Sequence, residues 1–203
     1  SALCRFYDVD SGQILVDGID VREWNKQEWR RHLGLVLQDV FLFSGDIATN
    51  ITLGDPRISE QRMVEAAARA QITPFIDKLP NRFQEEVQER GSTLSQGQRQ
   101  LLSFARALAF DPKILILDEA TSSVDTQTEG LIQEALNELL KNRTALIVAH
   151  RLSTIKHADR ILVIHNGEIR EEGNHDELLA RGGLYARLYD LQYRFQDRDL
   201  ATA

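Results

Sequence analysis

The chain has 203 residues, 42% of them hydrophobic, and a formal net charge of -7 from 24 Lys and Arg against 31 Asp and Glu. The hydrophobic content excludes a disordered protein, and the acidic balance argues against a nucleic-acid surface, because no basic stripe is available to neutralise phosphates. The single cysteine, Cys4, excludes an internal disulfide framework and fits a reducing compartment. No apolar run reaches the ~20 residues that a membrane-spanning helix needs.

The first part of the chain predicts short strands. Residues 13–21 read as a β-hairpin, because Asp17-Gly18 is a typical two-residue turn between two short apolar runs. Residues 33–37 form a continuous apolar run, which predicts a buried strand that ends at Gln38.

Helical periodicity dominates between residues 39 and 90, and an α/β pattern follows from residue 91. The expected elements after this point are a helix over 95–109, a strand over 114–117, a helix over 129–140, a strand over 144–149, a hairpin over 161–170 and a last helix over 175–192. Apolar strands that alternate with helices predict an α/β fold with a mostly parallel sheet covered on both faces.

Polar side chains follow three of the apolar strands directly: Gln38, Asp118-Glu119 and His150. In parallel sheets, ligands bind beyond the carboxyl ends of the strands. Asp118 could hold a hydrated Mg²⁺, Glu119 could orient a water for attack on a phosphate, His150 could donate to a phosphate oxygen, and Gln38 could ligate the metal or touch the water. Taken one at a time, each of these residues is also explained as a polar end of a strand.

The helix expected over residues 95–109 begins with a second polar feature. Ser95 is a suitable N-cap, and Gly97 lets a ligand approach the backbone closely. Free N–H groups and the helix dipole make such an end an anion site, although most helices capped by serine are only capped helices.

Two stretches of the chain resemble motifs of ATP-binding cassette (ABC) proteins. Residues 94–100, Leu-Ser-Gln-Gly-Gln-Arg-Gln, resemble the ABC signature motif. Residues 114–119 resemble the Walker B motif, and residues 120–125 resemble the D-loop that follows it.

Two further stretches complete the resemblance. Residues 36–44, around Gln38, resemble the Q-loop, and residues 149–154, around His150, resemble the H-loop switch. Four such stretches in the family's order are far more specific than any one of them. The similarity runs from residue 1 to about residue 192 and is greatest to the nucleotide-binding domains of exporters of the multidrug and lipid type.

The resemblance implies a P-loop NTPase-like fold of the ABC type with a helical subdomain. We expect residues 1–38 and 110–203 to form the catalytic α/β core. Residues 39–109 are expected to form the helical subdomain, with the signature helix and the exporter X-loop at residues 86–91. The X-loop is expected to meet the coupling helices of a transmembrane domain, with Glu89 as the contact residue.

The resemblance also implies roles in ATP hydrolysis for the residues at the strand ends. Asp118 corresponds to the Walker B aspartate that helps to hold Mg²⁺, and Gln38 to the glutamine that touches Mg²⁺ and couples to the transmembrane domain. Glu119 corresponds to the catalytic glutamate that polarises the attacking water, and His150 to the histidine that contacts the γ-phosphate of ATP.

The remaining implied roles belong to an interface between two such domains. Ser95, Gly97 and Gln98 match the signature residues that close over the nucleotide of the opposite protomer, and Asp125 matches the D-loop aspartate of the dimer interface. We therefore expect a homo- or heterodimer of nucleotide-binding domains. A transmembrane domain is expected in the same polypeptide, so that the chain works at the cytoplasmic face of the plasma (inner) membrane.

The sequence departs from the family pattern in two places. Gln96 stands where glycine is usual, with a mild expected effect, because Ser95 and Gly97 are kept. The P-loop, G-x-x-x-x-G-K-[ST], is absent from these 203 residues. By family spacing it would end shortly before Ser1, so we expect a truncated fragment that binds Mg-ATP poorly and is inactive by itself.

Two other interpretations stay open at the level of sequence. A soluble ABC ATPase without transport is one, and the acidic charge and the exporter-like residues 86–91 count against it. A non-catalytic partner domain that supplies only a signature surface is the other, and Glu119 counts against it, because such a partner needs no base.

Overall fold

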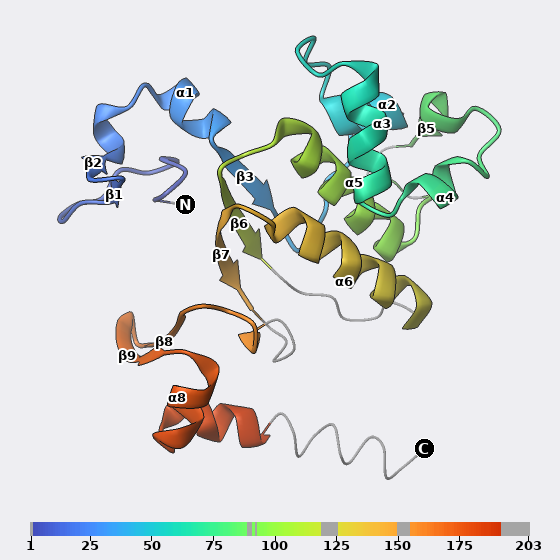
Figure 1. Ribbon diagram of the computed structural model, residues 1–203. Coiled ribbons are helices and arrows are strands. Elements are labelled where there is room, and N and C mark those ends of the chain that lie inside the picture. The colour runs from blue at the N-terminus through green and yellow to red at the C-terminus, as the bar shows by residue number, and fades with distance from the viewer. Residues whose placement is uncertain (1, 89–90, 92, 119–125, 150–154, 192–203) are drawn as a thin grey trace. The chain divides into compact units, whose positions relative to one another are not determined.

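A computed structural model describes residues 2–88, 91, 93–118, 126–149 and 155–191 (Figure 1). Contacts divide the chain into two compact units, Ser1–Val148 and Ala149–Ala203. Within the described residues, no helix is both long enough and apolar enough to cross a bilayer. The finer division at residues 38 and 109 remains a prediction.

A three-stranded parallel sheet organises the first unit. Its order is β3-β6-β7, from Leu33–Val36, Ile114–Asp118 and Thr144–Val148. Val36 lies opposite Leu117 in the β3–β6 ladder, and the β6–β7 ladder continues in register to the end of β6. Each strand is a short apolar run, as expected of a parallel sheet, and the predicted α/β class is confirmed.

One face of this sheet carries the core of the unit. Leu115 and Leu117 point to this face and are buried against α5, Gln96–Phe110, and α6, Thr126–Leu140. Figure 1 shows both helices on the same side of the strands. The helices present apolar residues at i, i+3 and i+4 spacing, so one stripe of each packs on the sheet.

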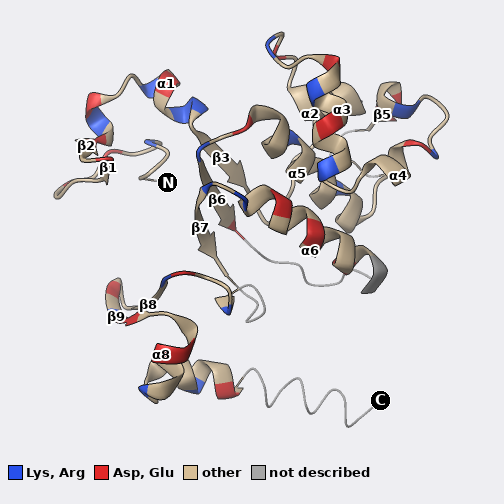
Figure 2. Cartoon of the chain, in the orientation of Figure 1, with Lys and Arg blue, Asp and Glu red and all other residues tan. Residues whose placement is uncertain are grey.

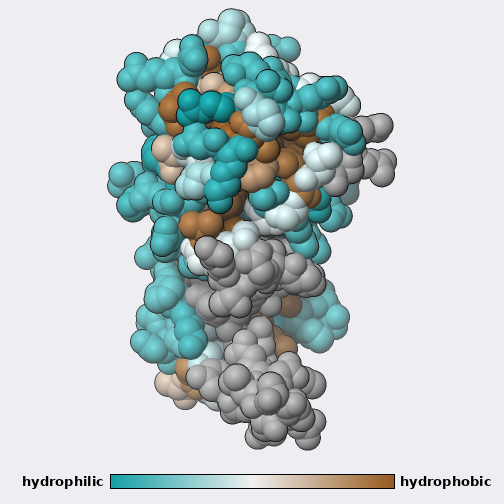
Figure 3. Space-filling view, turned by 90° about the vertical axis from the view of Figure 1, so that its right-hand side faces the viewer, coloured by the Kyte–Doolittle hydropathy of each residue, from teal (hydrophilic) through white to brown (hydrophobic). Residues whose placement is uncertain are grey.

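The other face of the sheet is only half covered. Leu35 of β3 and Leu146 and Val148 of β7 are 41%, 50% and 52% exposed. Helices flank the sheet, as predicted, but among the described residues they cover this face less completely than the face of Leu115 and Leu117. Figure 3 shows a different face, the right-hand side of Figure 1, where hydrophobic side chains also reach the surface between hydrophilic ones.

Helices are the main regular elements of residues 39–90. They are α2 (Ile47–Thr52), α3 (Glu60–Arg69), α4 (Thr73–Ile76) and a 3-10 turn at Arg82–Gln84. Ser59 caps α3 by accepting a hydrogen bond from the N–H of Arg62 at 3.2 Å. Met63, Ala66 and Ala67 turn to one side of α3 and are buried in the core that α2 and α5 share.

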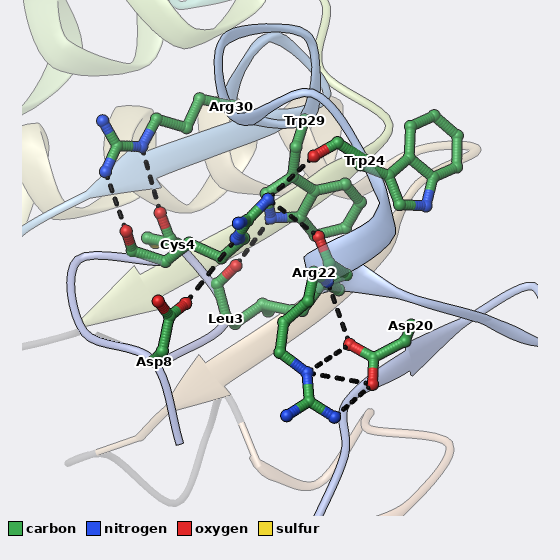
Figure 4. Close-up of polar contacts among 10 residues, drawn as sticks. Leu3, Cys4, Asp8, Asp20, Arg22, Trp24, Trp29 and Arg30 are labelled. Carbon is green, nitrogen blue, oxygen red and sulfur yellow. Dashed lines mark hydrogen bonds and ion pairs between the residues drawn. The ribbon is translucent and has the colours of Figure 1, made fainter. Parts of the chain in front are cut away.

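Residues 2–8 are hydrogen-bonded to the segment that precedes β3. The expected hairpin is present as β1 (Leu15–Val16) and β2 (Ile19–Asp20), followed by a 3-10 turn and α1 (Lys26–Arg31). The indole N–H of Trp29 donates to the carbonyl of Leu3 at 2.7 Å, and Arg30 donates to the carbonyl of Cys4 at 3.1 Å (Figure 4). These bonds hold residues 2–8 against α1.

Within residues 156–191, the second unit contains an antiparallel hairpin followed by two helices. The hairpin is β8 (Ile161–His165) with β9 (Glu168–Gly173), as the turn Asn166-Gly167 predicts. Figure 2 shows acidic residues on α8, which spans His175–Ala180. Ile161, Val163, Leu178 and Tyr185 form its small core.

The single helix predicted over residues 175–192 is wrong, because the chain forms two helices there. The first, α8, ends near Arg181, and Gly182 has φ +62, a conformation that stops an α-helix. A new helix covers residues 184–191. Glu171 caps it by accepting from the N–H groups of Leu184 at 2.5 Å and Tyr185 at 2.9 Å.

Candidate functional site

Two of the predicted site residues lie at the ends of neighbouring strands. Because Val36 lies opposite Leu117, Asp118 ends β6 beside the point where the chain leaves β3. Gln38 follows two residues after Val36 and is exposed, whereas Asp118 is half-buried. A carboxylate and an amide oxygen are thus brought to the same edge of the sheet, where α/β proteins bind ligands.

This pair of side chains fits a magnesium ion better than a metal held by protein alone. Among the described residues, no group of three or more His, Cys, Asp and Glu is arranged to hold a metal ion. Magnesium is usually bound by one or two protein oxygens, with waters and substrate phosphates as the other ligands. Asp118 and Gln38 match that donor set.

The beginning of α5 has the geometry of an anion site. Ser95 and Gln98 form a capping box: Ser95 Oγ accepts from the N–H of Gln98 at 3.2 Å, and Gln98 Oε1 accepts from the N–H of Ser95 at 2.9 Å. The Ser95 hydroxyl only accepts in this box, so its proton remains to be donated. The N–H groups of Gln96 and Gly97 belong to the first turn, which has no intrahelical acceptors for them.

Below the first turn of α5, a polar cleft of about 260 Å³ separates the helix from the segment after β3. Gln38 and Asp39 line one side, and Gln96, Arg99 and Gln100 line the other. The structure therefore brings the predicted Q-loop glutamine to the signature helix of the same chain.

Arg99 holds the loop that leads into α5. Its guanidinium donates to the carbonyl of Leu94 at 2.6 Å and to the carbonyl of Gly91 at 3.4 Å. The two carbonyl acceptors belong to a tight turn. Gly91 has φ +63 in this turn, and its own N–H group donates a hydrogen bond within the same loop. Ser95 is therefore held by the capping box on its C-terminal side and by the bond from Arg99 to Leu94 on its N-terminal side.

A larger groove, of about 550 Å³, lies elsewhere on the first unit, between α1, β3, α5 and the loop after α2. Its apolar lining includes the half-exposed Leu35 and Leu53. Its cationic lining consists of Arg30, Arg31, Arg57, Arg62 and Arg106. Figure 2 shows basic residues on α1, which borders it.

Most of the positive charge in this groove lacks a carboxylate partner. Arg57 pairs with Asp55, whose pKa it holds below the ordinary value by hydrogen bonding. Arg31, Arg62 and Arg106 form no ion pair with the carboxylates of the described residues. The groove is thus cationic on a chain of net charge -7.

Arg106 is the deepest of these cations. Its guanidinium donates to the carbonyls of Asn50 at 2.8 Å and Phe41 at 3.2 Å, and it lies 5.9 Å from the ring centre of Phe43. Burial lowers the pKa of Arg106. The residue joins α5 to the segment between β3 and α2.

The predicted X-loop is joined to the end of that segment. Its first residues form β5, Glu86–Val87, which pairs antiparallel with β4, Gly45–Asp46. Gly45 lies opposite Val87. Glu89, the predicted contact residue, lies outside the described residues.

Of the eight predicted site residues, five are described. Gln38 and Asp118 share one edge of the sheet, and Ser95, Gly97 and Gln98 share the first turn of α5. The other three, Glu119, Asp125 and His150, lie outside the described residues.

Sequence reasoning missed Gln100 and the arginines of the groove. A signal was available on α5, which is buried around most of its circumference. Gln100, Ser103 and Arg106 interrupt its apolar pattern at intervals of three residues, and a polar stripe on a buried helix indicates specific partners.

Comparisons with known proteins agree with this geometry. A family profile described as ABC transporter matches residues 1–122. The chain is 53% identical over 190 residues to the probable multidrug resistance ABC transporter ATP-binding/permease protein YheH of Bacillus subtilis, covering 94% of this chain and 28% of that protein. It is 50% identical over 186 residues to the fatty acid ABC transporter ATP-binding/permease protein of Mycobacterium bovis, covering 92% and 30%.

The fold matches that of one part of a solved ABC exporter. The structure of a bacterial Atm1-family ABC exporter with ATP bound superposes with a TM-score of 0.86 at 43% identity, covering 94% of this chain and 33% of that one. The chain thus spans about a third of the length of such proteins. It belongs to the ABC transporter family, as a nucleotide-binding domain of the exporter type.

Proposed function

We propose that the chain is the part of a membrane exporter that binds and hydrolyses ATP and thereby drives transport. The observation that carries this proposal is the placement of Gln38 and Asp118 at the same edge of the sheet, where the neighbouring strands β3 and β6 end. The capped first turn of α5 supports it, because it offers donors to a phosphate.

In this proposal, Gln38 and Asp118 hold Mg²⁺ together with the phosphates of ATP. The metal supplies charge neutralisation at the phosphates. Glu119 accepts the proton of the attacking water, and His150 donates a hydrogen bond to a terminal phosphate oxygen. Glu119 directly follows Asp118 in sequence, so a metal ligand and a base come from one strand end.

The proposed site is completed by a second nucleotide-binding domain, identical or different. Ser95, Gly97 and Gln98 face the nucleotide held by the partner, with the Ser95 hydroxyl donating to phosphate, and Asp125 lies at the interface. ATP favours the closed dimer, and hydrolysis releases it. The capping box supports this assignment, because it leaves the hydroxyl proton of Ser95 available.

We further propose that the cationic groove docks a segment of the transmembrane part of the protein. Relatives of this chain are named as fused ATP-binding/permease proteins, so the partner belongs to the same polypeptide. The groove has an apolar floor with Leu35 and Leu53, and it carries uncompensated arginines. This combination suits an amphipathic segment with acidic side chains. Residues 86–91, with Glu89, form a second contact.

Two consequences follow for the protein as a whole. The domain works on the side of the membrane that holds ATP, which is the cytoplasmic face. The 203 residues without a P-loop bind Mg-ATP weakly by themselves, because the backbone N–H groups and the lysine of that loop are the main phosphate ligands.

The test is ATP turnover by the full-length protein in lipid vesicles, with and without Glu119→Gln. We expect wild-type hydrolysis to depend on Mg²⁺, and the variant to lose at least about 100-fold in kcat while it still binds ATP. An inactive wild-type protein, or a fully active variant, would refute the proposed function. Glu129→Gln, an exposed substitution on α6, is the matched control.

A further inference from the structure

The side-chain amide of Asn50 is fully buried on α2 and is bonded through both its oxygen and its nitrogen. Its Oδ1 accepts from the N–H of Phe43 at 2.9 Å, and its Nδ2 donates to the carbonyls of Phe43 at 2.8 Å and Asp46 at 3.0 Å. Phe43 and Asp46 both belong to the segment between β3 and α2. The amide therefore holds the backbone of this segment at two points.

Arg106 of α5 is bonded to the same segment two residues earlier. Its Nη1 donates to the carbonyl of Phe41 at 3.2 Å, and its Nη2 lies 3.4 Å from Oδ1 of Asn50. The backbone on the two sides of Leu42 is thus bonded to two different helices, to α5 at Phe41 and to α2 at Phe43.

Apolar packing alone would leave the direction of this segment open. Leu42 is fully buried in the core, whereas Phe41 and Phe43 on its two sides are 52% and 50% exposed. One buried side chain fixes a point, whereas hydrogen bonds fix a direction, because they weaken steeply away from their preferred angles. The bonds from Asn50 and Arg106 therefore set the direction in which the backbone passes residue 42.

The direction of this segment matters because Gln38 directly precedes it. Gln38 lies two residues after Val36, which ends β3, and three residues before Phe41. Three residues of extended chain span about 10 Å, so a segment released at Phe41 gives Gln38 room to move. A displacement of only about 1 Å at a reacting centre can cost about 100-fold in rate.

We propose that Asn50 is a positioning residue that, together with Arg106, fixes the place of the Gln38 amide by orienting the segment that follows it. This inference rests on the proposed function, in which Gln38 and Asp118 hold Mg²⁺ with the phosphates of ATP. Asn50 touches neither the metal nor the nucleotide. It acts through the backbone between Phe43 and Gln38.

The experiment measures the Mg²⁺ dependence of ATP hydrolysis by the full-length protein in lipid vesicles, with and without Asn50→Asp. Aspartate keeps the shape of the side chain and the Oδ1 acceptor, but it places an oxygen instead of a donor against the carbonyls of Phe43 and Asp46. We expect the Mg²⁺ concentration for half-maximal turnover to rise at least about fivefold, because a displaced amide is a poorer ligand. An unchanged Mg²⁺ dependence would overturn the proposal.

Ile51→Val is the matched control for a loss of stability. Ile51 is the next residue of α2, is fully buried, and has no polar atom in its side chain. The smaller side chain should lower the midpoint of thermal unfolding, because it leaves part of the core unfilled. The Mg²⁺ dependence of this variant should stay that of the wild type. An equal shift in Ile51→Val and Asn50→Asp would show that any weakening of α2 has this effect, and it would overturn the proposal.

A second variant keeps the proposal testable if Asn50→Asp does not fold. Arg106→Lys keeps the positive charge but cannot reach the carbonyls of Asn50 and Phe41 in their separate directions, so it should also raise the Mg²⁺ requirement. Either variant combined with Gln38→Ala should need no more Mg²⁺ than Gln38→Ala alone, because the positioned ligand is already gone. Shifts that multiply, or a wild-type Mg²⁺ requirement in Arg106→Lys, would overturn the proposal.

A last readout does not depend on turnover. Hydrogen exchange at the backbone amides of residues 38–40, measured without nucleotide, should be faster in Asn50→Asp than in Ile51→Val. Equal exchange in the two variants overturns the proposal even if the protein proves to have no ATPase activity, whereas missing activity alone refutes only the proposed function.

Discussion

Arg106 of α5 donates a hydrogen bond from Nε to the carbonyl of Asn50 in α2 at 2.8 Å. Asn50 is fully buried and bonds in turn to the backbone of Phe43, accepting from its N–H at 2.9 Å and donating to its carbonyl at 2.8 Å. The segment after β3 is therefore held to two helices by polar bonds rather than by apolar packing alone.

Replacing Arg106 should destabilise the protein more than its position at a groove suggests. Arg106→Ala removes the donor to the carbonyl of Asn50, in a part-buried bond, and the donor to the exposed carbonyl of Phe41, so we expect the free energy of unfolding to fall by about 1–3 kcal/mol. Arg106→Lys should recover little, because an ammonium cannot reproduce the separate directions of the guanidinium. Denaturant unfolding measures both, with the exposed Arg57→Ala as a control of small effect.

Two serine caps with the same hydrogen-bond distance separate stability from activity. Ser59 caps α3 and Ser95 caps α5, each accepting from the N–H three residues on at 3.2 Å. Each substitution to alanine should lower the free energy of unfolding by about 1 kcal/mol. Only Ser95→Ala should also lower ATP turnover in the full-length protein, by at least about tenfold. Equal turnover in the two variants would remove Ser95 from the site.

The Mg²⁺ dependence of ATP hydrolysis should change on substitution of Asp118, at the carboxyl end of β6, but not on substitution of Asp111, before the strand begins. Asp118→Asn should raise the Mg²⁺ concentration needed for half-maximal ATP hydrolysis at least about tenfold, because a neutral amide is a weaker ligand. Asp111→Asn, before the strand, breaks the ion pair with Arg143 but should leave the Mg²⁺ dependence unchanged. A shift in both variants would indicate a general loss of structure.

Acid should weaken the second unit through Glu171. The N–H groups of Tyr185 and Leu184 hold the pKa of the Glu171 carboxyl below its ordinary value of 4.5. A lowered folded pKa adds stability above pH 4.5, and this stability is lost as the pH falls through the folded value. In acid titrations followed by circular dichroism, the Glu171→Gln variant should lose less stability over this pH range than the wild type does. The Glu168→Gln variant, changed at an exposed side chain, should lose as much as the wild type.

Local rules explain which parts of this fold were predictable. The helix α5 and the strand β6 were expected within a residue or two, because Ser95 is a strong cap and residues 114–117 are an uninterrupted apolar run. The break after α8 was missed, since the apolar period continues through Gly182 and only its positive φ stops the helix. The cleft at Gln100 depends on tertiary packing, which no local pattern encodes.

The parallel pairing of β3 with β6 also governs the order in which the protein forms. Leu33 finds its partner, Ile114, only after the helices between them have left the ribosome, at about 5–20 residues per second. Pairings between segments so distant in sequence are slow, whereas α2 and α3 need only local contacts. The edge of the sheet that carries Gln38 and Asp118 is therefore assembled late. Substitutions that weaken β6 should reduce the yield of folded protein during synthesis before any defect in chemistry can be measured.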